Sequence, residues 1–327
     1  MGGARLTDSG LHFGHYLGCL SHLHSLRYRN YVFVVRDNEF RYRFGQAETH
    51  FAFTDFAADV LAACPGAQIH VVRQTDLILA SPRLRTFLTH LITANQLFNA
   101  HAERGALMDG KRTNLSVAQL EFPIDSVCSY VGLQSRFICM NDDNIRFVNF
   151  GAEVTRRLNN AVPSATFPIP ELRTGMPSRI LGPDYQKMAF ARGNVLNFRD
   201  TDKGINSFVD RLFRKSAFFS AFPSEHSRFE ASPKTYRFDQ RFLPFSYLRA
   251  FDLVSAADLS AGMVMGDFND RKRILLSAIL NLFQSWREAR SRIFPEIELR
   301  LADSQRKMLE LAEPVEQLIS STGKVSN

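Results

Sequence analysis

Two histidines, His12 and His15, are the residues of this chain whose types and spacing best fit catalysis. Gly14 lies between them in the sequence Leu-His-Phe-Gly-His, which we expect to form the first turn of a helix. Imidazole N–H groups donate hydrogen bonds to phosphate oxygens on which negative charge builds up, and a helix N-terminus adds unpaired backbone N–H groups and a positive dipole end. Gly14 has no Cβ, so the backbone there can approach a flat ring or a phosphate closely. This pattern predicts a site for the phosphates of ATP.

A second segment suited to phosphate lies far along the chain, at residues 181–194, which read LGPDYQKMAFARGN. The two segments resemble, in the same order, the signature motifs of class I aminoacyl-tRNA synthetases. The particular resemblance is to the tryptophanyl-tRNA synthetase family, whose first motif usually reads P-T-G-x-L-H-x-G-H and whose second reads K-M-S-K-S-x-G-N. Residues 7–18 align with the first motif without a gap.

Two segments between these motifs follow the same family. Residues 121–144 match its T-Y-P-x-x-M-A-A-D-I-L-x-x-x-A-x-x-V-P-V-G-E-D-Q stretch in unbroken register, with Pro123 and Asp143 at identical positions. Residues 153–159 resemble its E-x-T-R-x-I-A-x-R-F-N helix in a slightly compressed form. Four ordered matches over most of the chain are hard to obtain by chance, so we expect a divergent paralog of this family.

The elements that would position these residues follow from the apolar pattern. Residues 31–35 and 68–72 are short runs of β-branched and aromatic residues bounded by polar ones, which is typical of buried parallel strands. Helical patterns cover residues 15–25 and 47–63, and the second pattern ends before a Pro-Gly turn. The order strand, helix, strand predicts an α/β fold with a doubly wound, Rossmann-like parallel sheet.

Ligands of such a sheet bind beyond the carboxyl ends of its strands. His12 and His15 would lie at this edge if residues 4–6 end the first strand. We expect that strand to be short, because the first residues, Met-Gly-Gly-Ala, offer almost no apolar side chain to its beginning.

The sequence predicts two domains of different character. Residues 1–199 would form the Rossmann-like domain, with a helical insertion at about 81–128. Residues 200–327 are first rich in Phe and Arg and then carry apolar residues at helical spacing over 270–292, so we expect an α-helical C-terminal domain. Residues 266–272 resemble a segment that opens a helix in the anticodon-side domain of the same family. Basic residues here that could contact RNA phosphates are Arg271, Lys272, Arg273, Arg287, Arg290 and Arg292.

The insertion would hold helices at 81–101 and 109–128. In the resembled family the equivalent insertion makes the dimer interface and holds the amino-acid pocket, so the resemblance implies a homodimer. Apolar side chains recur on one face of the first helix, at Leu84, Phe87, Leu88, Leu91 and Ile92. This stripe fits either packing inside the chain, which is the commoner use of such spacing, or a contact between two copies.

Composition limits the classes of partner and compartment. A net charge of +7 over 327 residues favours a polyanionic partner such as a nucleic acid, or is surface charge without a partner. The four cysteines show no C-x-x-C spacing and no His at zinc distance, so we expect neither a metal site nor a disulfide framework, and a cytoplasmic location. No apolar run reaches the roughly 18 residues that span a bilayer, and no signal pattern opens the chain, so we expect no membrane contact.

The resemblance implies amino-acid activation with ATP and Mg2+. An α-carboxylate attacks the α-phosphorus, pyrophosphate leaves, and an aminoacyl-adenylate remains for transfer to tRNA or another acceptor. Such a site needs positioning and positive charge more than a proton carrier. His12 and His15 would stabilise the pentacovalent phosphorus, and Lys187 would neutralise the leaving pyrophosphate. The implied ATP contacts are Thr7, Asp8, Gly14, Lys111, Asp143 and Met188.

The second motif departs from the family at its chemistry. Where the family has K-M-S-K-S, residues 187–191 read K-M-A-F-A, so Phe190 replaces the second lysine and both serine hydroxyls are missing. Losing one charge-assisted contact to a transferring phosphate costs about 3 kcal/mol of barrier, on the order of a hundredfold in rate. Arg192 is the candidate replacement, although a planar fork does not reproduce the point charge of a lysine.

The implied amino-acid pocket departs as well. The tyrosine of the family falls on Phe122, its indole-binding aspartate on Ser129, and the glutamine after its second aspartate on Asn144. A buried carboxylate that accepts the indole N–H gives strong selectivity, because an unpaired polar group costs about 1–3 kcal/mol. Ser129 can accept a hydrogen bond but is uncharged and shorter. The substrate is therefore tryptophan bound weakly, or another amino acid or analogue.

Two functions from different classes fit these residues. One is an ATP-dependent synthetase relative that charges a tRNA slowly or activates an amino acid for another acceptor. The other is a non-catalytic paralog that binds nucleotide, amino acid or RNA for regulation. His12, Gly14 and His15 favour the enzyme, whereas Phe190 and the missing serines favour the binding protein. An unrelated nucleotidyltransferase would have to match at Pro123 and at residues 153–159 by accident.

Overall fold

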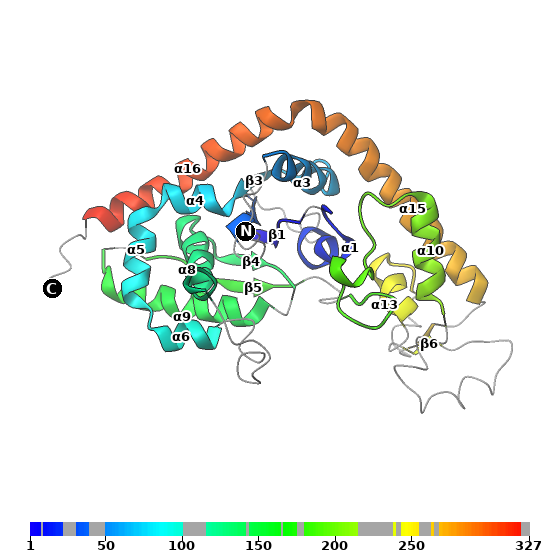
Figure 1. The fold of residues 1–327 in the computed structure, drawn as a ribbon, viewed down its shortest axis with the longest axis horizontal. Helices are drawn as coiled ribbons and strands as arrows, with labels where there is room; N and C mark the ends of the chain where they lie inside the picture. The colour runs from blue at the N-terminus through cyan, green and yellow to red at the C-terminus, as the bar shows by residue number, and fades with distance from the viewer. Residues whose placement is uncertain are drawn as a thin grey trace.

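The protein is built around a five-stranded parallel sheet with strand order β3-β2-β1-β4-β5 (Figure 1). The computed structural model describes residues 1–7, 9–21, 31–38, 50–100, 116–141, 144–164, 166–174, 180–214, 238–239, 243–254, 263–264 and 268–321. Its strands are β1 (Gly2–Arg5), β2 (Tyr31–Arg36), β3 (Ile69–Arg73), β4 (Phe137–Cys139) and β5 (Glu171–Arg173). The predicted Rossmann-like α/β fold is confirmed, as are the predicted strands at 31–35 and 68–72.

The sheet is buried on both faces, which explains why β2 reads as a continuous apolar run. Alternate side chains of β2 enter two separate cores. Phe33 packs on the side of α3 (His50–Ala63), and Val34 packs on the side of Leu77 in α4 (Gln74–Ala80). This arrangement leaves only the carboxyl ends of the strands for polar chemistry.

The first strand is as short as expected, and its glycines are needed for packing. A Cβ on Gly2 would lie 1.9 Å from the hydroxyl oxygen of Tyr31, and a Cβ on Gly3 would lie 2.7 Å from the carbonyl oxygen of Val34. The absence of side chains therefore lets β1 sit close to β2, where a larger residue would separate the strands.

The helix predicted at 15–25 takes a different form. A single α-turn, α1 (Phe13–His15), passes directly into a π-helical turn, η1 (Tyr16–Leu20). Gly18 of that turn lies so close to Asn141 that an added Cβ would be 1.5 Å from the amide oxygen of Asn141. Residues 22–25 of the prediction lie outside the described residues. The predicted helix at 47–63 is confirmed as α3, and residues 47–49 are not among those described.

The insertion is a cluster of short helices followed by two long ones. The predicted helix at 81–101 is two helices, because the chain turns extended at Ile92. The predicted helix at 109–128 begins after a capping box at Ser116 and runs four residues further than expected, while residues 109–115 lie outside the described part. The helices are α5 (Pro82–Leu91), α6 (Ala94–Ala100), α8 (Val117–Gly132, with Pro123 inside it) and α9 (Ile145–Ala161).

The apolar stripe of the insertion packs inside the chain. Leu84, Leu88 and Ile92 are buried among side chains of α8, α9 and α16 (Ile297–Ser321), and Phe87 and Leu91 pack against the same core. The stripe is therefore intramolecular core, and a homodimer stays a prediction from the resemblance.

The C-terminal part is helical, as predicted. Two long helices, α15 (Phe268–Ile293) and α16, are joined by the short turn η6 (Phe294–Glu296) and form an arch over the whole molecule (Figure 1). The helix α15 packs on α3 and α10, whereas α16 runs back along β3, α4 and α5. The remaining elements are α10 (Asp202–Leu212), α13 (Leu243–Ala250) and an antiparallel pair, β6 (Phe238–Asp239) with β7 (Met263–Val264).

The return of α16 covers β3, one of the two edge strands of the five-stranded sheet. Ser304 of α16 accepts a hydrogen bond from the backbone N–H of Val71 at 3.2 Å, so the helix pairs one of the strand's edge groups. Contacts of α16 with β3, α4 and α5 thus join the two predicted domains, residues 1–199 and 200–327. The division into these two domains stays a prediction. Among the described residues, no helix is both long and apolar enough to cross a membrane.

Candidate active site

The loop that follows β1 lies at the point where the strand order reverses. From β1 the chain continues to β2 and β3 on one side of the sheet, whereas β4 and β5 lie on the other side. Ligands of open α/β sheets bind at this point, beyond the carboxyl ends of the strands. His12 and His15 follow β1 directly and therefore lie at this edge, as predicted from the sequence.

The two imidazoles stack on each other, with ring centroids 3.7 Å apart and an interplanar angle of 21°. The backbone N–H of His12 donates to Nδ1 of His15 at 3.3 Å. A neutral His15 that accepts at Nδ1 carries its proton on Nε2, so that nitrogen is a donor. The first turn thus fixes the tautomer of His15.

Both histidines are neutral at physiological pH. Burial, reinforced by the charges of Lys187 and Arg5, lowers the pKa of His12 to about 3. Burial, together with His12, Arg36, Arg5 and Lys187, lowers the pKa of His15 well below its ordinary value. The pair can therefore donate neutral N–H hydrogen bonds to an oxyanion, while the positive charge of the site comes from the surrounding cations.

Gly14 creates the space in which His12 lies. A Cβ on Gly14 would be 2.9 Å from Cε1 of His12 and 3.4 Å from Sδ of Met188. Nδ1 of His12 is buried and has no hydrogen-bond partner among the described residues. The missing side chain thus lets both signature motifs close over the same backbone position.

The second motif is a tight loop held by one amide side chain. Asn194 donates from Nδ2 to Oδ1 of Asp184 at 2.8 Å and to the carbonyl oxygen of Lys187 at 3.1 Å, and its Oδ1 accepts from the backbone N–H of Ala189 at 2.8 Å. A Cβ on Gly182 would lie 2.4 Å from the carbonyl oxygen of Asn194. Asn194 therefore shapes the loop that carries Lys187.

Backbone hydrogen bonds join the two motifs. The N–H of Phe13 donates to the carbonyl oxygen of Leu196 at 2.8 Å, and the N–H of Phe198 donates to the carbonyl oxygen of Leu11 at 3.1 Å. This pairing brings the ring of Phe190 edge-on to His12, with centroids 5.2 Å apart. Phe190, at the position of the second lysine of the resembled motif, thus places an apolar ring against His12.

Arg192 and Phe190 share a short 3-10 helix, η4 (Phe190–Arg192), and the side chain of Arg192 is exposed. No described contact joins Arg192 to either histidine. Arg5 and Arg36, by contrast, are register partners at the carboxyl ends of β1 and β2, and both charges act on His15. Neither arginine was predicted as a site residue from the sequence. The signal that could have identified them is a basic residue at the carboxyl end of each strand.

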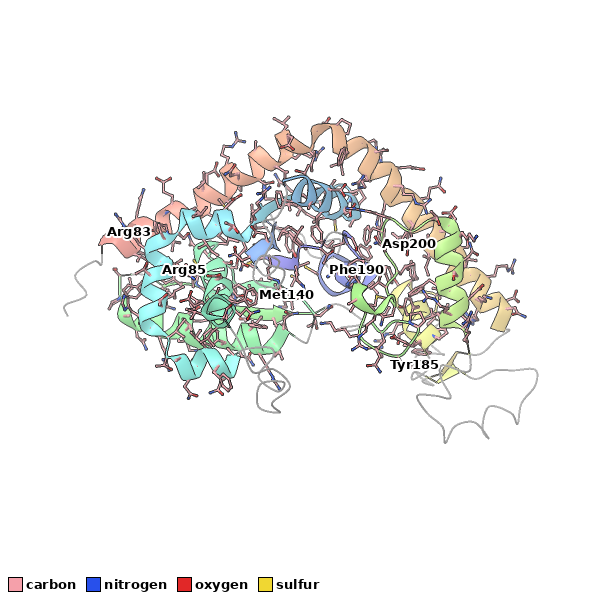
Figure 2. The ribbon with its side chains drawn as sticks, in the orientation of Figure 1. Arg83, Arg85, Met140, Tyr185, Phe190 and Asp200 are labelled. Carbon is pink, nitrogen blue, oxygen red and sulfur yellow. The ribbon has the colours of Figure 1, made fainter. Side chains whose placement is uncertain are left out.

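The predicted amino-acid pocket residues surround one small cavity of about 10 Å3. Ser129 and Asn144 line it, and Phe122 meets another lining residue, Phe147, edge-on at 5.8 Å between centroids. Gln74 and Arg36 also line this cavity and were not predicted as site residues. Figure 2 places Met140, a further wall of the cavity, and Phe190 in the central part of the molecule.

Of the remaining predicted site residues, one makes a structural hydrogen bond and three lie outside the described residues. The hydroxyl of Thr7 donates to the carbonyl oxygen of Gly10 at 2.7 Å and closes a turn of the loop. Asp8, Lys111 and Asp143 are not among the described residues. All four cysteines are buried thiols, and the described residues hold no cluster of three His, Cys, Asp or Glu side chains that could bind a metal.

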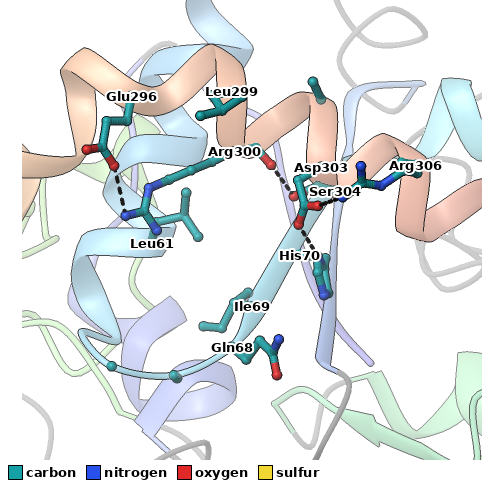
Figure 3. Close-up of a pocket in the computed structure, with 13 residues that line it drawn as sticks. Leu61, Gln68, Ile69, His70, Glu296, Leu299, Arg300, Asp303, Ser304 and Arg306 are labelled. Atoms are coloured by element: carbon teal, nitrogen blue, oxygen red, sulfur yellow. Dashed lines mark hydrogen bonds and ion pairs between the residues drawn. The ribbon is translucent and has the colours of Figure 1, made fainter.

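A much larger hollow lies elsewhere, between β3 and α16 (Figure 3). It measures about 860 Å3, and its walls include His70, whose Nδ1 is 3.7 Å from a carboxylate oxygen of Asp303. None of the predicted site residues lines this groove. This groove is therefore separate from the candidate site at the switch point of the sheet.

Comparison with solved structures decides the fold. The tryptophanyl-tRNA synthetase of Campylobacter jejuni superposes with a TM-score of 0.71 at 15% identity, covering 98% of this chain and 97% of that one. The chain has the fold of tryptophanyl-tRNA synthetases. The enzyme of Mycoplasma pneumoniae gives a TM-score of 0.72 at 14% identity over 98% and 96% of the two chains. A C. jejuni structure complexed with ADP and tryptophan gives 0.70 at 16% identity over 98% of both.

The tryptophanyl-tRNA synthetase fold extends to the C-terminal helices, because the matches cover nearly the full length of both chains. No model of a known protein family and no curated protein sequence matches this chain. The relationship is thus carried by structure and by the ordered motifs.

Proposed function

We propose that this protein is an ATP-dependent, synthetase-like ligase that activates an amino acid as its aminoacyl-adenylate. The observation that carries the proposal is the stacked, neutral pair of His12 and His15 at the carboxyl end of β1. The cations Arg5, Arg36 and Lys187 act on this pair. Neutral donors surrounded by fixed positive charge suit a reaction at a phosphate ester.

The residues fit ATP. Nδ1 of His12 has no hydrogen-bond partner among the described residues, and Gly14, which lacks a Cβ, leaves the room that the His12 ring needs. Thr7, Asp8, Lys111, Asp143 and Met188 complete the proposed ATP contacts. Mg2+ would enter on the phosphate oxygens of ATP, as it does in many phosphoryl-transfer sites.

In the proposed reaction, a carboxylate oxygen of the amino acid forms a bond to the α-phosphorus. The bond from that phosphorus to the bridging oxygen breaks, and pyrophosphate leaves with the electron pair. N–H groups of His12 and His15 stabilise the negative charge on the phosphorus oxygens, and Lys187 neutralises the leaving pyrophosphate. Arg192, which is exposed in η4, is a further catalytic candidate for binding the leaving pyrophosphate.

The amino-acid side of the proposed site consists of Phe122, Ser129 and Asn144. The adenylate would pass to tRNA or to another acceptor, and the proposed assembly, a cytoplasmic homodimer, rests on the sequence resemblance and the cysteine usage. The proposed substrate is tryptophan or another amino acid.

One observation favours the alternative, a non-catalytic paralog that binds nucleotide, amino acid or RNA. Phe190 lies against His12 where the family has a lysine, and the neighbouring serines are alanines. Such a protein would keep the binding site and lose the adenylation activity.

Amino-acid-dependent exchange of pyrophosphate into ATP separates the two functions. We expect exchange by the unaltered chain and its loss in His15→Ala, while His90→Ala, which changes an exposed histidine of α5, keeps it. ATP binding without exchange for any amino acid would overturn the enzyme and leave the binding protein.

A further inference from the structure

Gln74 lines the small cavity beside Ser129 and carries a hydrogen-bond acceptor that no described residue uses. The residue is 1% exposed, its Nε2 donates to Oγ of Ser129 at 3.3 Å, and its Oε1 is buried without a partner in the described part of the chain. A buried acceptor without a donor costs free energy, and such a group is commonly satisfied when a ligand binds.

The orientation of this amide follows from its neighbour. Oγ of Ser129 donates its single proton to the carbonyl oxygen of Asp125 at 2.9 Å. Only lone pairs of Ser129 therefore remain for Gln74, which must turn its NH2 group toward Ser129 and its carbonyl oxygen away. The free acceptor is thus dictated by the network.

The start of α4 is anchored, so Gln74 is held in place. The backbone N–H of Thr75 donates to Oδ1 of Asp37 at 3.0 Å, and the hydroxyl of Thr75 donates to Oδ1 of Asn38 at 2.6 Å. Asn38 in turn donates to Asp125 at 3.4 Å. Arg85, labelled in Figure 2, holds the same Asp125 carboxylate at 2.9 Å. A network of this kind preorganises a specificity group.

The cavity is small. Its volume of about 10 Å3 is close to the minimum that holds one water molecule, and Tyr130, Met140 and Phe147 form its apolar walls. An indole does not enter such a space unless these walls move. A hydroxyl group, or one end of a short amide, is of the right size.

The polar groups of the cavity further restrict which amino-acid side chains can bind. An apolar side chain would leave Oε1 of Gln74 unpaired, and a carboxylate, which only accepts, would oppose it. The guanidinium of Arg36, on the same cavity, disfavours a cationic side chain. An uncharged side chain that carries a hydrogen-bond donor is compatible with both Gln74 and Arg36.

We propose that Gln74 replaces the lost carboxylate of the family as the specificity acceptor, and that the pocket selects an amino acid with a short hydroxyl or carboxamide side chain in place of tryptophan. This inference rests on the proposed function for the role of the cavity as an amino-acid pocket. Its test therefore measures binding separately from catalysis.

The test is equilibrium binding of L-threonine, L-serine and L-asparagine to the full chain, beside L-valine, L-alanine, L-aspartate and L-tryptophan, with ATP and Mg2+ present. Each polar ligand has a matched analogue that lacks the donor. We expect at least one of the three polar amino acids to bind at least about tenfold more tightly than its analogue and than tryptophan. Tighter binding of tryptophan, or no preference within any pair, would overturn the inference.

Variants assign the preference to Gln74. We expect Gln74→Met to abolish the discrimination within the pair and Gln74→Glu, which keeps an acceptor, to retain it. Gln305→Met, at an exposed position of α16, should bind like the unaltered chain. Discrimination that survives in a folded Gln74→Met protein would contradict the assignment, and Gln74→Leu, which also lacks the acceptor, tests it if the Met variant does not fold.

The outcomes separate this inference from the proposed function. Selective binding of threonine, serine or asparagine without pyrophosphate exchange would support the pocket and refute the ligase. Exchange that responds to tryptophan alone would support the ligase and refute the pocket.

Discussion

The ring of Phe190 meets the imidazole of His12 edge-on, with 5.2 Å between ring centroids. Phe190 occupies the position of the second lysine in the motif that the chain resembles. The loop thus places an aromatic ring, and no charge, beside His12 at this position. Compensation of phosphate charge then depends on Lys187 and on the strand-end cations Arg5 and Arg36.

Replacing Phe190 by lysine should accelerate adenylation. A charge-assisted donor beside a transferring phosphate contributes on the order of a hundredfold, and we expect Phe190→Lys to raise the rate of pyrophosphate exchange by about tenfold or more. Phe190→Leu, which removes the ring without adding charge, is the matched control. A lysine variant no faster than the leucine variant would show that the position does not reach the phosphates.

Arg5 should contribute to ATP binding. It lies in register with Arg36 at the carboxyl end of the sheet, and its charge acts on both histidines. We expect Arg5→Met to raise the Kd for ATP by about tenfold, and Arg306→Met, at an exposed position of α16, to leave it unchanged. Equal affinities for ATP in the two variants, measured by titration calorimetry, would remove Arg5 from the site.

The histidine pair should make stability depend on pH. The pKa of His12 falls from an ordinary 6.5 to about 3 in the folded protein, so between these values the unfolded chain binds a proton that the folded chain does not. The free energy of unfolding therefore rises with pH up to about 6.5 and is lost as the pH falls, by about 1.4 kcal/mol per pH unit for one such histidine. Urea denaturation at pH 5 and pH 7.5 measures this difference.

In a His12→Gln variant the difference between the two pH values should shrink by about 2 kcal/mol, and in His90→Gln it should not change. An unchanged pH dependence in the His12 variant would mean that His12 is not buried as a neutral group.

Asp59 should be a structural link between the first motif and the C-terminal helices. Its carboxylate is 1% exposed and accepts from Arg199 at 2.8 Å, from Arg290 at 2.7 Å and from the backbone N–H of Leu11 at 3.4 Å. Removing one partner of a buried ion pair costs several kcal/mol, but these arginines are partly exposed and also contact Asp55. We therefore expect Asp59→Asn to lower the free energy of unfolding by about 2–3 kcal/mol.

Glu153→Gln provides the comparison for Asp59, because it removes an exposed ion pair with Arg157 that contributes at most about 1 kcal/mol. If the two variants lost equal stability in urea, the buried junction would have no special role.

Helices and strands that are determined by their own residues could be predicted from local patterns in the sequence. The apolar run of β2 and the helical spacing of α3 and α15 are local signals, and the order of strands and helices then implied the sheet and the place of His12. The short β1 could likewise be predicted from its glycines.

Features that depend on contacts between distant residues could not be predicted. The helix after His15 becomes a π-turn where Gly18 meets Asn141, and α16 returns to β3 through contacts such as Ser304 with Val71. Gln74 was missed for the same reason, because its role arises from Ser129 and Asp125 on another helix. Sequence showed that an acceptor was lost at position 129 but not that α4 supplies another.

The most direct test of the proposed adenylation follows one oxygen atom. An amino acid labelled with oxygen-18 in its α-carboxylate is incubated with the protein, ATP and Mg2+, and hydroxylamine then cleaves the acyl bond. If the carboxylate attacks the α-phosphorus, the released AMP carries oxygen-18 on its phosphate, and His15→Ala releases none. Hydrolysis of ATP to unlabelled AMP or to ADP, or no reaction with any amino acid, would contradict the account.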